Sequence, residues 1–319
     1  MNQKPIQTLQ ELSQNLRADC YYFVSPCSAG DTYYLCALKQ TLEKQLQGKI
    51  IFVIKPTHKA VCDMFGAECM ICETKIADIF QHYQCFENDA VMSVPTLCKL
   101  YPAHPIPLRK WNYPCKTMLE MYLHCFDLPL DTKCDLPTNL PKIDESLRAK
   151  LHKIAPLDKI ILFCPEAHTL PCLPTIIFKD ECDRLLKQGY KIIVNIPGHK
   201  EYLRFFSDGM YDLDLSLKEA VALGISCAGV ISTRSGFCDI IAPHCENLIV
   251  YDTNCAWSSI KYLNKANPPQ EISVYDNLAY KRYLRAKRTI CESLPMKLYK
   301  RYASKGFLKK LRTPFTLYT

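Results

Sequence analysis

One order of segments occurs twice in this chain: a short apolar run, a turn, a stretch with apolar residues at helical spacing, and a second apolar run. The runs of the first copy are CYYFVSP (20–26) and GKIIFVIKP (48–56). Those of the second copy are KIILFCP (159–165) and GYKIIVNIPG (189–198). Each copy predicts a β-α-β unit with parallel strands, so the chain is an α/β protein.

The length of 319 residues favours two domains of ordinary size. Residues 126–147 contain three prolines and no sustained period, which is typical of an interdomain connection. We therefore expect an N-terminal domain over 1–145, a second domain over 146–270 and a basic helical tail over 271–319. Helix, strand, turn, helix and strand signals over 217–252 extend the second sheet. The simplest architecture is two doubly wound Rossmann-like domains facing a central cleft.

The composition and the pattern of apolar residues indicate where in the cell the protein is expected. No apolar run approaches the roughly 18 residues of a membrane span, and the first 20 residues lack the apolar core of a secretory signal. We expect a cytoplasmic protein whose 19 cysteines are free thiols. Cys69 and Cys72 have the spacing of a zinc pair, and His82 and Cys85 would have to complete the site. The alternative is chance spacing in a cysteine-rich chain, and we expect no metal.

The net charge of +8 is concentrated near the C-terminus. Residues 281–312 hold twelve Lys or Arg and one acid, Glu292, a net +11, so the rest of the chain carries about −3. Tyr, Leu and Phe are interleaved with these charges, which favours a helix lying on an anionic membrane surface. A solvated basic helix is the alternative. No nucleic-acid recognition motif is present, so nucleic acid is not an expected partner.

The stretch VISTRSGFCDII (230–241) predicts a strand, a turn and a helix start. Ligands of such sheets bind at the carboxyl ends of strands, where a helix N-terminus attracts phosphate. Gly236 would let the backbone approach a diphosphate, Ser235 would cap or donate, and Arg234 would add a cation. The alternative is an ordinary capped turn with a surface arginine.

Asp31 stands at the corresponding turn of the first copy, directly after Gly30. A carboxylate there, facing a phosphate cradle on the other domain, fits group transfer from a nucleotide, with the acid taking a proton from an acceptor hydroxyl. The alternative is a helix N-cap. His58 and His199 also follow strands, and we expect both to be exposed loop residues.

These segments, in this order over residues 20–255, resemble the ADP-heptose:lipopolysaccharide heptosyltransferase group of GT-B glycosyltransferases. The resemblance implies a GT-B fold, a nucleotide-sugar donor as substrate with no further cofactor, and no metal requirement. It implies that Asp31 is the general base.

The donor-binding turn of that group falls on Arg234, Ser235, Gly236, Phe237 and Asp239. Only its Ser-Gly core matches, because arginine replaces an aspartate of the family and Asp239 replaces a histidine.

The loop after the first strand of the second domain holds a lysine in that family. Here Glu166 and His168 occupy the loop instead, and we expect both to contact the donor.

Two functions are consistent with these residues. The first is an inverting glycosyltransferase that moves a sugar to a lipopolysaccharide, capsule or other surface-glycan acceptor, with the basic tail docking it at the inner face of the membrane. The second is a non-catalytic nucleotide-sugar-binding or scaffold protein that keeps the fold. Gly30-Asp31 favours the enzyme, and the altered donor turn favours the scaffold.

Overall fold

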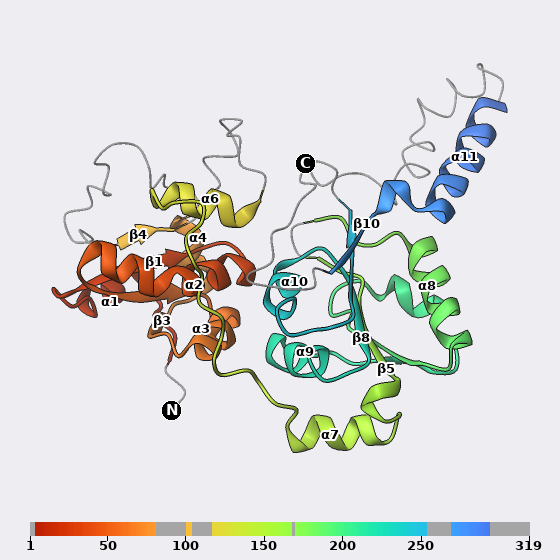
Figure 1. Ribbon diagram of the computed structural model, residues 1–319, viewed down its shortest axis with the longest axis horizontal. Helices are drawn as coiled ribbons and strands as arrows, with labels where there is room; N and C mark the ends of the chain where they lie inside the picture. Colours follow the sequence, from red (N-terminus) through yellow and green to blue (C-terminus); the bar gives the residue numbers. More distant parts are fainter. Residues whose placement is uncertain (1–3, 81–99, 104–116, 168–169, 254–268, 294–319) are drawn as a thin grey trace.

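The computed structural model describes residues 4–80, 100–103, 117–167, 170–253 and 269–293. These residues form two parallel sheets, each covered by helices (Figure 1). The strands of the first sheet, in the spatial order β3-β2-β1-β4, are β1 (Cys20–Ser25), β2 (Lys49–Ile54), β3 (Cys69–Ile71) and β4 (Leu100–Pro102). Its helices are α1 (Leu9–Gln14), α2 (Ala29–Leu46), α3 (Lys59–Phe65), α4 (Thr74–Ile79) and α6 (Met118–Cys125).

The second sheet has the order β10-β9-β8-β5-β6-β7. Its strands are β5 (Ile160–Cys164), β6 (Lys191–Val194), β7 (Met210–Asp212), β8 (Gly229–Thr233), β9 (Leu248–Asp252) and β10 (Gln270–Ser273). The helices that accompany it are α7 (Glu145–His152), α8 (Thr175–Lys187), α9 (Leu217–Gly224), α10 (Gly236–Ile241) and α11 (Leu278–Ser293). Short 3-10 turns are η1 (Pro56–His58), η3 (Leu157–Lys159), η4 (Lys200–Phe205) and η5 (Val274–Asp276).

Both β-α-β units expected from the sequence are present, as β1-α2-β2 and β5-α8-β6. The central strands are mostly apolar because helices cover both faces of the sheet; all five residues of β5 are buried. The limit expected for the second domain at residue 270 falls on the first residue of β10, which pairs with β9. Val274 and Tyr280, just beyond it, belong to the core of this half.

The topology fixes where ligands can reach each sheet. Strand order reverses direction between β1 and β4 in the first sheet and between β5 and β8 in the second. A crevice forms at such a switch point, outside the carboxyl ends of the strands. Asp31 follows β1, Glu166 follows β5 and Arg234 follows β8. These candidate residues, predicted from the sequence, therefore lie at the switch points.

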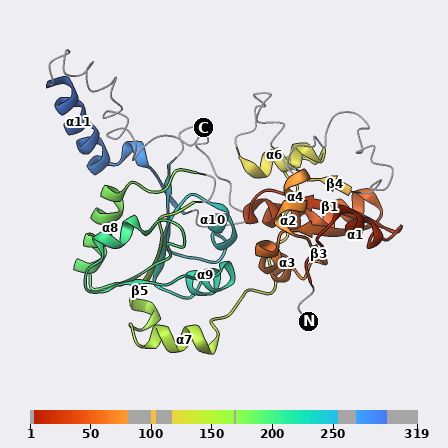
Figure 2. The same cartoon turned by 180° about the vertical axis from the view of Figure 1, so that it is seen from behind.

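Helix α2 lies between the two halves of the molecule, beside α10 (Figure 1 and Figure 2). Every residue from Gly30 to Leu38 is buried. The first sheet, α3 and α10 contact different sides of this segment, so it has no solvent side and no strong helical periodicity. One hydrophobic cluster consequently runs from the first half into the second.

The segment between α6 and α7 follows the surface of the first half before it reaches the second (Figure 1). The backbone N–H of Asp135 donates to the Ala37 carbonyl at 2.8 Å. The N–H groups of Thr138 and Asn139 donate to the Met64 carbonyl at 3.0 and 2.9 Å. These bonds attach the connection to α2 and α3.

Among the helices of the described residues, none combines the length and apolar character needed to cross a bilayer.

Candidate functional site

Asp31 lies in the first turn of α2, where its side chain accepts three hydrogen bonds. Ser28 donates to Oδ2 from its backbone N–H at 2.9 Å and from its hydroxyl at 2.6 Å. The hydroxyl of Tyr122, on α6, donates to Oδ1 at 2.7 Å. The residue is only 8% exposed. Asp31 is therefore a helix-capping residue as well as a candidate base, and a second helix fixes its orientation.

The turn after β8 is built as the sequence indicated, with Ser235 at the N-cap of α10 and Gly236 as its first residue. The Arg234 N–H donates to the Tyr251 carbonyl of β9 at 2.9 Å, which keeps the turn on the sheet edge. The buried Thr233 hydroxyl donates to the Pro165 carbonyl at 2.8 Å. This last bond ties the end of β8 to the loop after β5.

The turns before α2 and α10, expected to face each other across a cleft, touch. A Cβ added at Gly236 would lie 2.4 Å from the Gly30 nitrogen and 2.7 Å from its Cα. A Cβ added at Gly30 would lie 2.6 Å from the Gly236 Cα and 3.2 Å from Oδ2 of Asp239. No gap separates the two turns at this point, because two glycines let the backbones approach to contact.

Asp239 joins the two halves instead of lining the space between them. The hydroxyl of Tyr34, on α2, donates to its Oδ1 at 2.8 Å. The pKa of Asp239 is raised to about 7, mainly by burial, and the negative charges of Asp31 and Glu271 contribute to the rise. The Tyr34 hydrogen bond and the Arg234 charge oppose this rise in pKa. Tyr34 also stacks on Tyr122 at a centroid distance of 5.9 Å, so the donors to the two carboxylates are packed together.

A pocket of about 520 Å³ lies at the switch point of the second sheet. Its lining residues come from the ends of β5, β6 and β8 and from the start of α9: Cys164, Glu166, Ala167, Asn195, Pro197, Gly198, His199, Leu215, Leu217, Ala220, Ser235 and Phe237. Its volume and its wall of apolar and polar side chains suit a nucleoside.

Of the predicted donor residues, the pocket includes Glu166, Ser235 and Phe237. Arg234, Gly236 and Asp239 do not line it, because the contact with α2 covers Gly236 and Asp239. His168 lies outside the described residues.

The Glu166 carboxylate shapes the pocket. It accepts the backbone N–H groups of Gly198 at 3.0 Å and His199 at 2.5 Å, which joins the loop after β5 to the loop after β6. Asn195 is used similarly, since its Oδ1 accepts the Leu215 N–H at 3.2 Å. Both side chains hold loops in place at the pocket wall.

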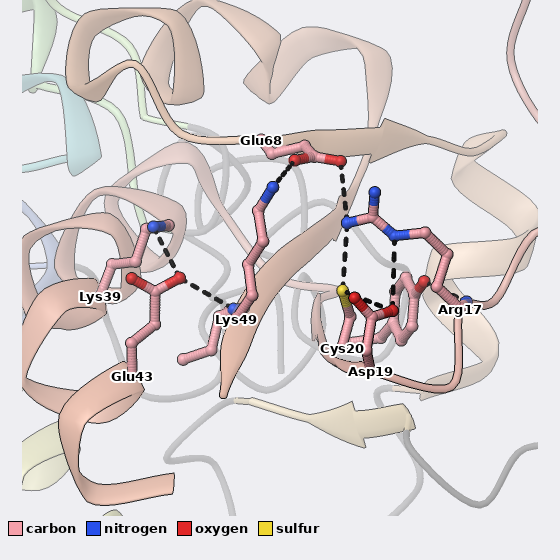
Figure 3. Close-up of polar contacts among 9 residues, drawn as sticks. Arg17, Asp19, Cys20, Lys39, Glu43, Lys49 and Glu68 are labelled. Carbon is pink, nitrogen blue, oxygen red and sulfur yellow. Dashed lines mark hydrogen bonds and ion pairs between the residues drawn. The ribbon is translucent and has the colours of Figure 1, made fainter. Parts of the chain in front are cut away.

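A hollow of about 560 Å³ lies beside the start of β2 and the later turns of α2, lined by Lys39, Glu43, Lys44 and Lys49 among others. Its walls are paired charges (Figure 3): Lys39 with Glu43 at 2.7 Å, and Lys49 with Glu68 at 2.5 Å. This hollow adjoins the start of β2, so it lies away from the switch points. We place the site at the pocket of the second sheet.

A buried polar chain beside Asp31 was missed by sequence reasoning. The Ser25 and Thr32 hydroxyls are 2.8 Å apart, and Thr32 Oγ1 lies 2.9 Å from Nδ1 of His58. His58 is 5% exposed, so the expectation of an exposed loop residue is wrong. Burial, aided by the charge of Lys55, lowers the pKa of His58 to about 4. The histidine is therefore neutral at pH 7 and fixes the first turn of α2.

Within the described residues, no group of three His, Cys, Asp or Glu side chains is placed to hold a metal ion. Cys72 is buried and its thiol donates to the Ile54 carbonyl at 3.5 Å. Burial raises the pKa of Cys72 to about 11. His82 and Cys85, the other imagined zinc ligands, lie outside the described residues.

The solved structures that are similar to this chain over most of its length include two glycosyltransferases. The alignment with ADP-heptose LPS heptosyltransferase II of E. coli covers 85% of this chain and 98% of that protein, with a TM-score of 0.55 and 14% identity. The alignment with a glycosyl transferase family 9 protein from Veillonella parvula covers 85% of this chain and 90% of that protein, with a TM-score of 0.56 and 13% identity.

The chain has the GT-B fold. No protein-family model matches it, and no curated protein matches it in sequence. The GT-B fold confirms the architecture that the repeated β-α-β order and the resemblance predicted. At 13–14% identity the likeness is one of fold, so the activity has to be argued from the site itself.

Proposed function

We propose that this protein is a metal-independent, inverting glycosyltransferase that uses a nucleotide-sugar donor. The observation that carries the proposal is the pocket at the switch point of the second sheet, which ends at Ser235 and Phe237, next to the turn that carries Asp31. A nucleoside in this pocket places its phosphates toward the junction of the two halves. The junction is also where an acid from the first half is available.

The pocket wall supports a nucleoside ligand. Leu215, Leu217 and Phe237 offer an apolar surface for a base, and the polar groups of Asn195 and Glu166 lie among them. The proposed diphosphate site is the turn beside Ser235, with Arg234 as the cation. The Arg234 charge is close enough to lower the pKa of Asp239, so it acts at this junction.

In the proposed reaction an acceptor hydroxyl attacks the anomeric carbon of the donor sugar. A bond forms between the acceptor oxygen and that carbon, and the bond from the carbon to the phosphate oxygen breaks. Asp31 takes the hydroxyl proton, and the nucleoside diphosphate leaves with the bonding electron pair. Tyr122 and Ser28 hold the carboxylate in one orientation. Oδ2 accepts two hydrogen bonds from Ser28, whereas Oδ1 accepts one from Tyr122 and keeps a further lone pair for the acceptor.

The acceptor in this proposal is a surface glycan or glycolipid such as lipopolysaccharide or capsule, met at the inner face of the membrane. The exposed residues of α11 support this: Lys281, Arg282 and Arg285 are exposed together with Leu278 and Leu284. The helix extends away from the second sheet (Figure 1). Attraction to an anionic bilayer contributes about 1 kcal/mol for each basic residue near the surface.

A second candidate is a nucleotide-sugar-binding protein without catalysis. The observation that favours it is the environment of Asp31, whose two oxygens already accept bonds from Ser28 and Tyr122 and whose surface is 8% exposed. Asp31→Asn distinguishes the two candidates. The enzyme loses roughly 10²–10⁴ in turnover with donor affinity little changed, because only the base is removed. Full transfer activity in a folded Asp31→Asn variant would reduce the carboxylate to a helix cap.

Ligand-induced stabilisation tests the donor site directly. Melting temperatures are measured with nucleoside diphosphates and nucleotide sugars, because a ligand at 100 times its Kd stabilises a fold by about 2.7 kcal/mol. Arg234→Ala should reduce the shift, since a charge-assisted contact contributes about 1.5–3 kcal/mol. The exposed Arg204, in η4, provides the matched control Arg204→Ala. If no nucleotide raises the melting temperature, the proposed donor site is wrong.

A further inference from the structure

The close contact between the two halves depends on the absence of a side chain at Gly30 and Gly236. Neither residue belongs to the glycines with positive φ, which are Gly66, Gly189 and Gly209. Their backbones therefore do not need glycine for conformation, and alanine is the better helix former by about 1 kcal/mol. The glycines are explained by proximity, because a Cβ at either position would lie within 2.4–2.7 Å of backbone atoms of the other.

The contact leaves no room for a ligand. A phosphate group is larger than a methyl group, and a single Cβ already overlaps backbone atoms at this junction. Tyr34 and Asp239 close the same junction by their hydrogen bond of 2.8 Å between the halves. Tyr34 is buried and Asp239 is half-buried in this state.

We propose that this junction is an autoinhibitory latch: Tyr34 and Asp239 hold the two turns together, and the turn at Gly236 accepts a donor diphosphate only when they part. The opening of the latch is a property of the two halves alone. Its effect on donor binding rests on the proposed function.

The charged and titratable groups around Asp239 make the stability of the closed latch depend on pH. Tyr33, Tyr34 and Asp31 face it from α2, Arg234 from its own turn and Glu271 from β10. Burial favours the neutral form, so the closed state binds a proton that the open state releases. The closed state is accordingly most favoured below the ordinary pKa of an aspartate, and this advantage is lost as the pH rises through about 7.

The first experiment measures opening without any ligand. Hydrogen-exchange protection of residues 29–35 and 236–241 is compared in the wild type, Gly30→Ala, Tyr34→Phe and the control Tyr190→Phe. Tyr190 directly precedes β6, in the second half. Protection should fall about 2- to 10-fold in Tyr34→Phe, the factor for one hydrogen bond. Protection should fall about 5- to 100-fold in Gly30→Ala, because the added methyl group overpacks the junction. Small-angle scattering should show a larger radius of gyration for Gly30→Ala and Tyr34→Phe than for the wild type.

Unchanged protection in Tyr34→Phe, together with an unchanged radius of gyration, overturns the latch even if Gly30→Ala fails to fold. The pH arm uses Asp239→Asn, which keeps an acceptor for Tyr34 and removes the titration. Wild-type protection factors should fall between pH 6 and pH 8, and those of Asp239→Asn should not. Equal pH dependence in both proteins also contradicts the proposal.

The last experiment measures donor affinity. A closed majority state reduces apparent affinity by the open fraction, so Tyr34→Phe should tighten nucleoside diphosphate binding by about 2- to 10-fold. If Tyr34→Phe opens the junction while no nucleotide binds either protein, the latch stands and the proposed function fails. If nucleotide binds both proteins equally despite opening, the latch does not control the site and the proposal is overturned.

Discussion

Tyr122→Phe removes a single hydroxyl from the most enclosed part of the site, and its cost follows from the geometry. The hydroxyl is fully buried and donates to a carboxylate at 2.7 Å. A hydrogen bond to a charged group contributes about 1.5–3 kcal/mol to stability. The phenyl ring stays, so stacking on Tyr34 and Phe126 is kept and no cavity larger than one oxygen forms. The free energy of unfolding should fall by about this amount.

The neighbouring Tyr33 is a matched control. It is equally buried, yet within the described part of the chain its hydroxyl has no hydrogen-bond partner. Tyr33→Phe should therefore be neutral or stabilising, because it removes a buried polar group without breaking a bond. Urea unfolding at pH 7.5, with reductant to protect the thiols, gives the two midpoints at a common slope. If Tyr122→Phe lowers the midpoint no more than Tyr33→Phe does, the hydrogen bond to Asp31 is not what stabilises this helix turn.

Three further outcomes are expected. The folded protein binds fewer protons at His58 than the unfolded chain, since its pKa falls from 6.5 to about 4. Unfolding free energy should therefore drop on acidification from about pH 6.5 to 4, by up to about 1.4 kcal/mol per pH unit, and His58→Gln should flatten that part of the denaturation-versus-pH curve. Thr233→Val should cost about 1 kcal/mol in urea unfolding, because the Pro165 carbonyl loses its buried donor. Binding to anionic vesicles through residues 281–312 should weaken as salt rises from 0.05 to about 0.5 M in a flotation assay, and salt-independent binding would contradict an electrostatic contact.

The sequence predicted the parts of the fold that depend on local pattern. Apolar runs located β1, β2, β5 and β6 to within a few residues at each end, because a strand buried on both faces is continuous in sequence. The short strands β4 and β10 were not predicted, since three or four residues carry too little pattern.

The candidate site was predicted less completely, because its geometry depends on distant pairs. Tyr34 and Asp239 are 205 positions apart, and Tyr122 and Asp31 are 91 apart. Nothing in a tyrosine's local sequence indicates its hydrogen-bond partner. The placement of Ser235 and Phe237 at the pocket needed only the order of strand, turn and helix, whereas the exclusion of Asp239 required the position of α2.

The attachment of the connecting segment determines how far the two halves can travel. Its backbone bonds end at Asn139, and α7 begins at Glu145, so only the residues at 140–144 are left as a tether. Five residues span at most about 17 Å when fully extended. A tether of that reach keeps the separated turns at an effective concentration on the order of millimolar or higher. Any parting of the halves is therefore intramolecular, and re-closure is a first-order event that does not depend on protein concentration.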